Sequence, residues 1–303
     1  MINGIINVYK EQGFTSFDVV AKLRGILKQK KIGHTGTLDP MAEGVLMVCL
    51  GKATKLVDML TEGDKEYRTT MKLGISTDTE DITGKILEEK ELPDDISEAE
   101  IIDTINSFIG DYDQIPPMYS AIKKDGKKLY EYARQGIEIE RTPRPVTIFS
   151  IDNISVNLPY ISFDVHCSKG TYIRSLCRDI GDKLKVGATM TALTRSHVHG
   201  HHIDDSLKLN QIEKLVSEGE LDKYILPVDA LVSEYDKYLI KDKYSKYLFN
   251  GNKLYPNQLF SEDTDKKFKD KDIIRIYYKD EFLALYEYSE SDNILIPYKM
   301  FLG

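Results

Sequence analysis

The sequence predicts an α+β fold, with a mainly antiparallel mixed sheet flanked by helices and a small β-rich domain at the C-terminal end. Strand and helix patterns are mixed along the chain without a regular strand–helix–strand alternation. The 303 residues are 41% hydrophobic and 30% charged, a globular composition that is long enough for about two domains. "ILPVDALV" near residue 230 indicates the end of one unit, and a Tyr-rich, acidic stretch follows it. We therefore expect domains at residues 1–232 and 233–303.

The N-terminal part predicts a strand, a loop and a helix. Ser16 is the expected N-cap of this helix, because apolar residues follow it at helical spacing. "GVLMVCLG", which starts at Gly44, predicts a fully buried strand, and "ATKLVDMLTEG" predicts a short helix that ends at Gly63. "KEYRTTMKLG" then alternates between apolar and polar residues, which is typical of a strand.

The second part continues the mixture. "DDISEAEIIDTINSFIGDY" predicts an amphipathic helix with Gly110 at its end, and "VTIFSIDNISVN" with "YISFDVHC" predicts a pair of strands. "YIRSLCRDIGDKL" has apolar residues at helical spacing. "DIIRIYYKDEFLALYEYSE" predicts two C-terminal strands joined by a Lys-Asp turn.

The charge is unevenly distributed. A net charge of −8 argues against a nucleic-acid partner. However, residues 21–38 hold five basic residues and no acid, and residues 120–145 hold seven basic residues against four acids. The acids concentrate elsewhere, for example in "TDTEDITGKILEEKELPDDISEAE". Local basic surfaces can bind a polyanion, although a lysine-rich stretch can equally be a solvated face.

The three cysteines favour a cytoplasmic protein. They have no CxxC spacing, which argues against a disulfide framework and a zinc site. The N-terminus lacks the pattern of a signal peptide. The longest apolar run, Val45 to Leu50, is far shorter than the ~20 residues of a membrane-spanning helix, so we expect no membrane association.

The loop "GHTGTLDPMAEG" contains the candidate reactive group, the carboxylate of Asp39. Asp39 precedes Pro40, which biases its backbone toward an extended conformation, and Gly33 and Gly36 permit turns. Together they can present one carboxylate at a loop tip where a ligand can approach. The alternative is an Asx turn in which the side chain only caps its own loop.

Each of the other candidate residues also fits a purely structural role. Tyr67 fits a half-buried strand position, Arg174 an exposed helix position, and Leu193 the core. "QIPPMYSAIKKDGKKLYEYARQG" fits a surface loop and helix, but its alternating basic and tyrosine residues also suit phosphate contact and base stacking. His197, His199 and His201 alternate, so one strand face could hold a metal ion, but no cysteine or paired carboxylate accompanies them and we expect none.

Taken in order, five motifs closely resemble the bacterial tRNA pseudouridine synthase B (TruB) family over residues 1 to about 232. They are "GHTGTLDPMAEGVL", "KEY", "QIPPMYSAIKKDG", "GTYIRSLCRDIG" and "LTRSHVHG". The C-terminal "RIYYKDEFLALYEYS" is similar to a PUA-type RNA-binding domain. The resemblance implies an isomerase that converts uridine-55 in the T loop of tRNA to pseudouridine. It also implies an RNA-clamping insertion at about residues 110–145.

The resemblance also implies roles for individual residues. Asp39 matches the catalytic aspartate, Tyr67 the tyrosine that stacks on the target base, and Arg174 the arginine that pairs with the aspartate. Substrate-binding roles are implied for six further residues, namely Lys10, His34, Lys123, Lys124, Leu193 and Arg195. The family's N-terminal loop usually has a proline where this chain has Glu11. This difference is expected to affect the stiffness of the loop and the position of Lys10.

This reaction is an isomerisation, so we expect no cofactor and no metal. A nearby arginine is expected to lower the pKa of Asp39. The expected partner is the T-arm of tRNA, bound by a monomer. Two other functions stay open: a non-catalytic tRNA-binding or tRNA-folding protein, which needs no carboxylate at Asp39, and a base-removing glycosidase, which usually needs two carboxylates.

Overall fold

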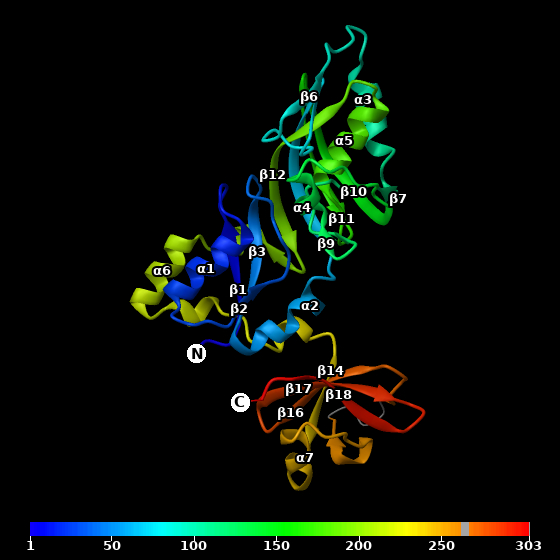
Figure 1. Cartoon of the computed structure of the whole chain (residues 1–303). Helices are drawn as coiled ribbons and strands as arrows, with labels where there is room; N and C mark the ends of the chain where they lie inside the picture. Colours follow the sequence, from blue (N-terminus) through cyan, green and yellow to red (C-terminus); the bar gives the residue numbers. More distant parts are fainter. Residues whose placement is uncertain (262–266, 303) are drawn as a thin grey trace.

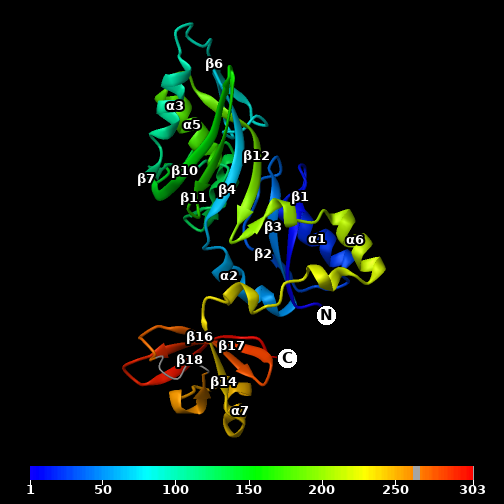
Figure 2. The ribbon, with the colours of Figure 1, turned by 180° about the vertical axis from the view of Figure 1, so that it is seen from behind.

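The computed structural model describes residues 1–261 and 267–302, which form two large sheets, two small two-stranded sheets and the helices around them. The larger sheet occupies the upper body in Figure 1, and the C-terminal sheet lies below it in both views (Figures 1 and 2). This confirms the predicted α+β class.

The larger sheet is mixed and mainly antiparallel. Its main strands are, in spatial order, β1 (Gly4–Lys10), β3 (Glu43–Leu50), β12 (Ala188–Val198), β4 (Lys65–Leu73), β11 (Tyr160–Cys167), β10 (Arg144–Asn157) and β7 (Gly110–Gln114). Only β3 and β12 pair in parallel along this path, while β2 (Ile32–His34) adds to β3. The predicted strand pair is confirmed as the antiparallel β10–β11 hairpin. A separate two-stranded sheet of β5 (Ile75–Thr77) and β6 (Ile86–Glu89) contacts β12 of the larger sheet.

Two groups of helices cover the larger sheet (Figure 1). The helices α1 (Ser16–Ile26) and α6 (Leu209–Glu218) pack near β1 and β3, and their apolar residues form one core cluster with these strands. The helices α3 (Glu98–Asn106) and α5 (Ile173–Lys183) pack with β10, β11, β12 and β4 in a second cluster. The pocket described below lies at the edge of this second cluster.

Three predicted helix ends are wrong by a few residues. The N-cap of α1 is Thr15, because its side chain and that of Asp18 form a reciprocal capping box, and Ser16 is instead buried as the first helical residue. The short helix α2 (Val57–Leu60) follows a 3₁₀ turn and ends before Gly63. Gly110 does not end α3 but starts β7 with a φ of 109°, a backbone conformation that favours glycine.

The strand expected to hold three alternating histidines is interrupted. β12 ends at Val198, and His199 with Gly200 makes a turn of positive φ before β13 (His201–His202). His197 therefore lies opposite His202 in a hairpin, and the three histidines do not share one strand face. Within residues 1–261 and 267–302 there is no group of three or more metal-ligating side chains.

The C-terminal sheet has the order β15 (Leu259–Phe260), β14 (Asp236–Ile240), β16 (Ile273–Tyr278), β17 (Glu281–Ser289) and β18 (Ile294–Met300), and α7 (Ser245–Phe249) packs beside it. The predicted Lys-Asp turn joins β16 to β17. Leu285 and Phe301 share a core cluster with Leu56, and Lys299 pairs with Asp58 at 2.6 Å. None of the helices described is long and apolar enough to cross a membrane.

Candidate active site

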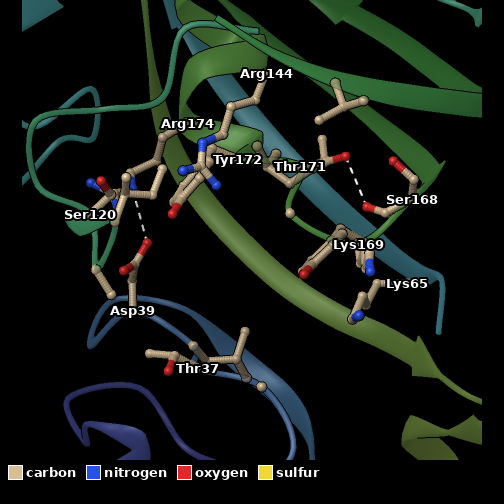
Figure 3. Close-up of a pocket in the computed structure, with 18 of the residues that line it drawn as sticks. Thr37, Asp39, Lys65, Ser120, Arg144, Ser168, Lys169, Thr171, Tyr172 and Arg174 are labelled. Atoms are coloured by element: carbon tan, nitrogen blue, oxygen red, sulfur yellow. Dashed lines mark hydrogen bonds and ion pairs between the residues drawn. The ribbon is translucent and has the colours of Figure 1, made fainter. Parts of the chain in front are cut away.

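A pocket of about 800 Å³ opens where β4 and β12 meet the Asp39 loop and the start of α5. Five residues predicted from the sequence line it: Asp39, Tyr67, Arg174, Leu193 and Arg195. They come from segments far apart in the chain, and the sheet brings them together. Figure 3 shows Asp39 and Arg174 pointing toward each other across this pocket.

The Asp39 loop is held by the first residue of α1 and by the segment before it. Ser16 Oγ accepts a hydrogen bond from the Leu38 amide at 2.9 Å and lies 3.3 Å from the Leu38 carbonyl. The amide of Gly13 donates to the Pro40 carbonyl at 2.8 Å, and the amide of Ala42 donates to the Asp39 carbonyl at 3.1 Å. The burial of Ser16 therefore serves this loop, and the backbone on both sides of Asp39 is fixed.

Arg174 joins the Asp39 loop to two other segments. Its Nε lies 2.9 Å from Asp39 Oδ2 (dashed in Figure 3). Its Nη1 donates to the Thr79 carbonyl at 2.9 Å, and its Nη2 donates to the Tyr119 carbonyl at 3.0 Å. The Arg174 side chain is only 5% exposed, so its orientation is set by these contacts rather than by solvent. The guanidinium is a planar fork that can satisfy three such partners at once.

Arg174 acts to lower the pKa of Asp39, as expected, but the net pKa of Asp39 is raised. Burial in the pocket raises the pKa of Asp39, and the neighbouring Arg174 and Lys10 cations only oppose this effect. Burial disfavours the charged carboxylate because it removes water from it. The Asp39 side chain nevertheless keeps 35% of its surface exposed, and Arg174 favours its charged form.

Tyr67 and Leu193 form the apolar part of the pocket. β4 and β12 pair so that Leu193 lies opposite Thr69 and Arg195 opposite Tyr67. Tyr67 is 9% exposed and Leu193 is 7% exposed, and both belong to the core cluster behind the pocket. Burial raises the pKa of Tyr67, so its ring enters the pocket as a neutral phenol. A flat aromatic face beside an aliphatic side chain is suited to hold a planar base.

Arg195 lines the pocket but is largely committed to the protein. Its Nε donates to the Val45 carbonyl at 2.8 Å, and its Nη2 donates to the Gly36 carbonyl at 3.1 Å. The backbone of Arg195 also lies close to Gly44. A side chain at Gly44 would not fit, because its φ is 102° and a Cβ there would lie 2.3 Å from the Arg195 carbonyl oxygen. Arg195 thus connects β12 to both ends of the Asp39 loop, and its substrate contact stays a prediction.

Lys10 does not fit the predicted direct contact with the substrate. It has no exposed surface, and its Nζ donates to the carbonyls of Ala42 at 2.5 Å and Glu11 at 3.1 Å, with the Pro40 carbonyl at 3.5 Å. Burial lowers the pKa of Lys10 to about 8. Lys10 therefore holds the Asp39 loop from behind, and Glu11 contributes only its backbone to this contact.

Lys10→Met is accordingly expected to lower the rate of the pseudouridine formation that the sequence resemblance implies, about 10-fold to 100-fold, because a small displacement of Asp39 is costly. The affinity for the implied substrate, tRNA, is expected to stay within about threefold, with an unchanged salt dependence, because Lys10 reaches no surface. Filter binding at several salt concentrations measures this. The contrasting variant is Lys123→Met, which removes an exposed lysine and is expected to reduce the salt slope by about one. A lower salt slope for Lys10→Met would show that Lys10 contacts the RNA after all.

The remaining predicted residues lie outside the pocket lining. His34 ends β2, and its ring meets Phe17 edge-on with centroids 6.2 Å apart. Burial lowers the pKa of His34, and its Nδ1 is buried without a partner in the described protein. Lys123 and Lys124 lie on a small hairpin of β8 (Lys123–Lys124) and β9 (Lys127–Lys128). Their RNA contacts, like that of His34, stay predictions.

Sequence reasoning missed several residues of the pocket. They are Lys65, Ser120, Arg144, Lys169 and Tyr172. Figure 3 labels them around Asp39 and Arg174. Tyr119, which the sequence favoured for base stacking, also lines the pocket. Ser120 and Tyr172 belong to motifs that carry the family resemblance, but nothing in their spacing separates them from packing residues.

Two solved structures of RNA-associated assemblies contain chains with the same fold. A Cbf5–Nop10–Gar1 complex contains a chain that matches with a TM-score of 0.72 and 28% identity over 99% of this chain and 85% of that one. An H/ACA ribonucleoprotein bound to a substrate RNA containing 2′-deoxyuridine matches with a TM-score of 0.72 and 26% identity, again over 99% and 85% of the two chains. Both matches span almost the whole of this chain, so they define its fold.

Sequence comparison gives the family. Residues 24–173 match the N-terminal domain of TruB family pseudouridylate synthases, and residues 174–233 match the C-terminal domain of tRNA pseudouridylate synthase B. The chain is 48% identical to tRNA pseudouridine synthase B of Clostridium tetani over 94% of this chain and 95% of that protein. It is 50% identical to that of Lachnoclostridium phytofermentans over 99% and 100%. This chain belongs to the TruB family of pseudouridylate synthases.

Proposed function

We propose that this protein is the isomerase that converts uridine-55 of tRNA to pseudouridine, with Asp39 as its catalytic carboxylate. The observation that carries this proposal is the Asp39–Arg174 pair at 2.9 Å, placed in a pocket whose apolar wall is Tyr67 and Leu193. The pair supplies a charged oxygen, and the wall supplies a surface for a planar base. A pocket of about 800 Å³ has the size of sites that enclose a small organic group.

The reaction fits this set of groups. The N1–C1′ glycosidic bond breaks, the uracil turns, and C5 bonds to C1′. C5 loses a proton and N1 gains one, so the reaction has no net oxidation or reduction. The Asp39 carboxylate acts as a nucleophile or as a base. The geometry is compatible with attack on C1′, attack on C6, or removal of a ribose proton.

The target base has to leave its stack in the tRNA to reach Asp39. Flipping a base costs a few kcal/mol, which contact with Tyr67 and Leu193 partly offsets. The insertion at residues 110–145 lies beside the pocket and carries tyrosines under cations, with Lys128 Nζ 5.4 Å and Arg134 5.3 Å from the Tyr130 ring centroid. Such groups suit phosphate contact and base stacking, so this insertion is proposed to hold the T-arm.

Other properties follow from the same proposal. The C-terminal sheet is proposed to be a PUA-like RNA-binding domain that adds tRNA contacts, and residues 1–232 are proposed to be the catalytic domain. One T-arm and one pocket need only one copy of the chain, so the protein is proposed to act as a monomer. The cytoplasm is the proposed compartment, where three buried thiols stay reduced.

The test uses unmodified tRNA labelled with tritium at C5 of uridine. The proposed function predicts tritium release of one equivalent per tRNA, and the same release from an isolated T-arm hairpin. Release of free uracil would instead indicate a base-removing enzyme. Binding of tRNA without any tritium release would leave a tRNA-binding or tRNA-folding protein and contradict the proposal.

A further inference from the structure

Glu80 is a buried acid outside the pocket lining that the proposed chemistry does not use. It is 7% exposed and lies in the turn after β5, where its φ is 62°. Its amide donates to the Thr77 carbonyl, and its own carbonyl accepts from the Met190 amide, both at 3.2 Å. A non-glycine residue with positive φ is uncommon and is held by its surroundings. The side chain of Glu80 therefore leaves the turn in a fixed direction.

The Glu80 carboxylate faces two arginines and a hydroxyl, which with Glu80 are called here the Glu80 cluster. Ser175 Oγ donates to Glu80 Oε2 at 2.6 Å. Glu80 Oε1 contacts Arg178 Nη1 and lies 3.6 Å from Arg141 Nη1. Asp179 pairs with Arg178 at 2.7 Å, so the two arginines face two acids. Removing one partner from such a buried set leaves a charge uncompensated, which is costly.

The Glu80 cluster reaches both ends of the insertion. On its N-terminal side, Arg178 Nη2 donates to the Ile115 carbonyl at 2.9 Å and Arg141 Nη1 to the Pro116 carbonyl at 3.1 Å. Arg141 itself stands at the C-terminal side of the insertion. Between these two ends lie the segment 119–122 and Tyr130, which line the pocket.

The Glu80 cluster shares the helix α5 with Arg174. Arg174 and Arg178 are on α5, one turn apart, and Ser175 follows Arg174. The two carbonyls that fix the Arg174 guanidinium belong to Thr79, next to Glu80, and to Tyr119, in the insertion. Any shift of the insertion relative to α5 therefore moves a hydrogen-bond partner of the arginine that pairs with Asp39.

We propose that Glu80 is a positioning residue whose carboxylate holds the insertion over the pocket through Arg141 and Arg178 and so keeps Arg174 on Asp39. The part that concerns Arg174 rests on the function proposed above. The part that concerns the insertion does not, because it describes the protein without RNA. Glu80 touches no substrate and acts only through these arginines.

The first test is limited trypsin digestion of the RNA-free protein, well below the unfolding temperature of each variant. Glu80→Gln keeps the shape of the side chain but removes its charge. We expect cleavage within residues 123–134 to become about tenfold faster, because the insertion opens locally while the sheet stays folded. The matched control is Glu88→Gln on β6, an exposed acid that pairs with Lys90 at 3.1 Å and is expected to leave the rate unchanged.

The second test is the single-turnover rate of pseudouridine formation with excess enzyme. Glu80→Gln is expected to lower this rate about 10-fold to 100-fold, because Asp39 and Arg174 lose their alignment. The affinity for tRNA should fall less than the rate. A merely structural role would instead lower the active fraction and leave the rate of the folded fraction unchanged. If the wild-type protein forms no pseudouridine, the proposed function fails, while the digestion still decides the role of Glu80.

Arg141→Met approaches the same contact from the insertion and changes a partly exposed side chain, so it decides the question even if Glu80→Gln does not fold. As with Glu80→Gln, we expect Arg141→Met to make trypsin cleavage of the insertion faster and pseudouridine formation slower. The double variant should be no worse than the more affected single variant within about twofold, since both changes break one interaction. Normal protection of the insertion with a wild-type rate in either single variant would overturn the proposal, as would effects that multiply in the double variant.

Discussion

Asp39→Asn is expected to abolish pseudouridine formation, with a rate at least about 10⁴-fold below that of the wild type. Asparagine has the shape of aspartate, and its carbonyl oxygen can still accept a hydrogen bond from Arg174 Nε. The loop should keep its conformation, because Ser16 and Gly13 bind its backbone rather than the Asp39 side chain. Only the charge and the nucleophilic or basic oxygen are lost.

The affinity for tRNA separates chemistry from binding in this experiment. It is expected to stay within about threefold of the wild type, because one pocket group contributes little beside the phosphate contacts that dominate RNA binding. Asp103→Asn, an exposed acid on α3, is the matched control and should retain the wild-type rate. If Asp39→Asn forms pseudouridine at a tenth of the wild-type rate or faster, Asp39 is not the catalytic carboxylate.

Arg174→Met is expected to lower the rate at least about 100-fold at neutral pH. It removes the cation beside Asp39 and leaves the carbonyls of Thr79 and Tyr119 without their donor. Arg174→Lys keeps the charge but not the planar fork, so it should lose rate at every pH without restoring the three contacts. Single-turnover assays of both variants measure these losses.

The pH profile identifies why Arg174 matters. Burial raises the pKa of Asp39 and Arg174 opposes this rise, so Arg174→Met raises the pKa of Asp39 further. Because the reaction needs the ionised carboxylate, the rate falls as pH drops through this pKa. The acid limb should therefore move to higher pH in Arg174→Met and move less in Arg174→Lys. An acid limb that stays in place in Arg174→Met would show that the arginine acts only by position.

Much of the fold was predictable because the spacing of apolar residues along the sequence indicates which face of each strand or helix is buried. The alternation in "KEYRTTMKLG" and the apolar run of "GVLMVCLG" predicted β4 and β3, and the helical spacing after Tyr172 predicted α5. Helix ends were less predictable. At the start of α1, Thr15 and Ser16 are neighbours with similar capping ability, and the tertiary contact of Ser16 with Leu38 decides between them.

The geometry of the site was predictable only in part. The Gly-Thr-Leu-Asp-Pro loop indicated a presented carboxylate, but the sign of the change in its pKa depends on how the walls of the pocket exclude water. Lys10 carried the charge of a surface residue, and its burial depends on carbonyls thirty residues away in the Asp39 loop. Glu80 stands in the acidic stretch "TDTEDITGKILEEKELPDDISEAE", where nothing in the sequence singled it out. Its partners, Arg141 and Arg178, come from segments that only the folded sheet brings beside it.

The most direct test of the central claim is a position-resolved nucleoside analysis of one tRNA after a single turnover with excess enzyme. The account predicts pseudouridine at position 55, an intact sugar–phosphate backbone without abasic sites, and no product with Asp39→Asn at equal tRNA occupancy. Unmodified uridine-55 in a saturated wild-type complex would contradict it, and so would an abasic site at that position.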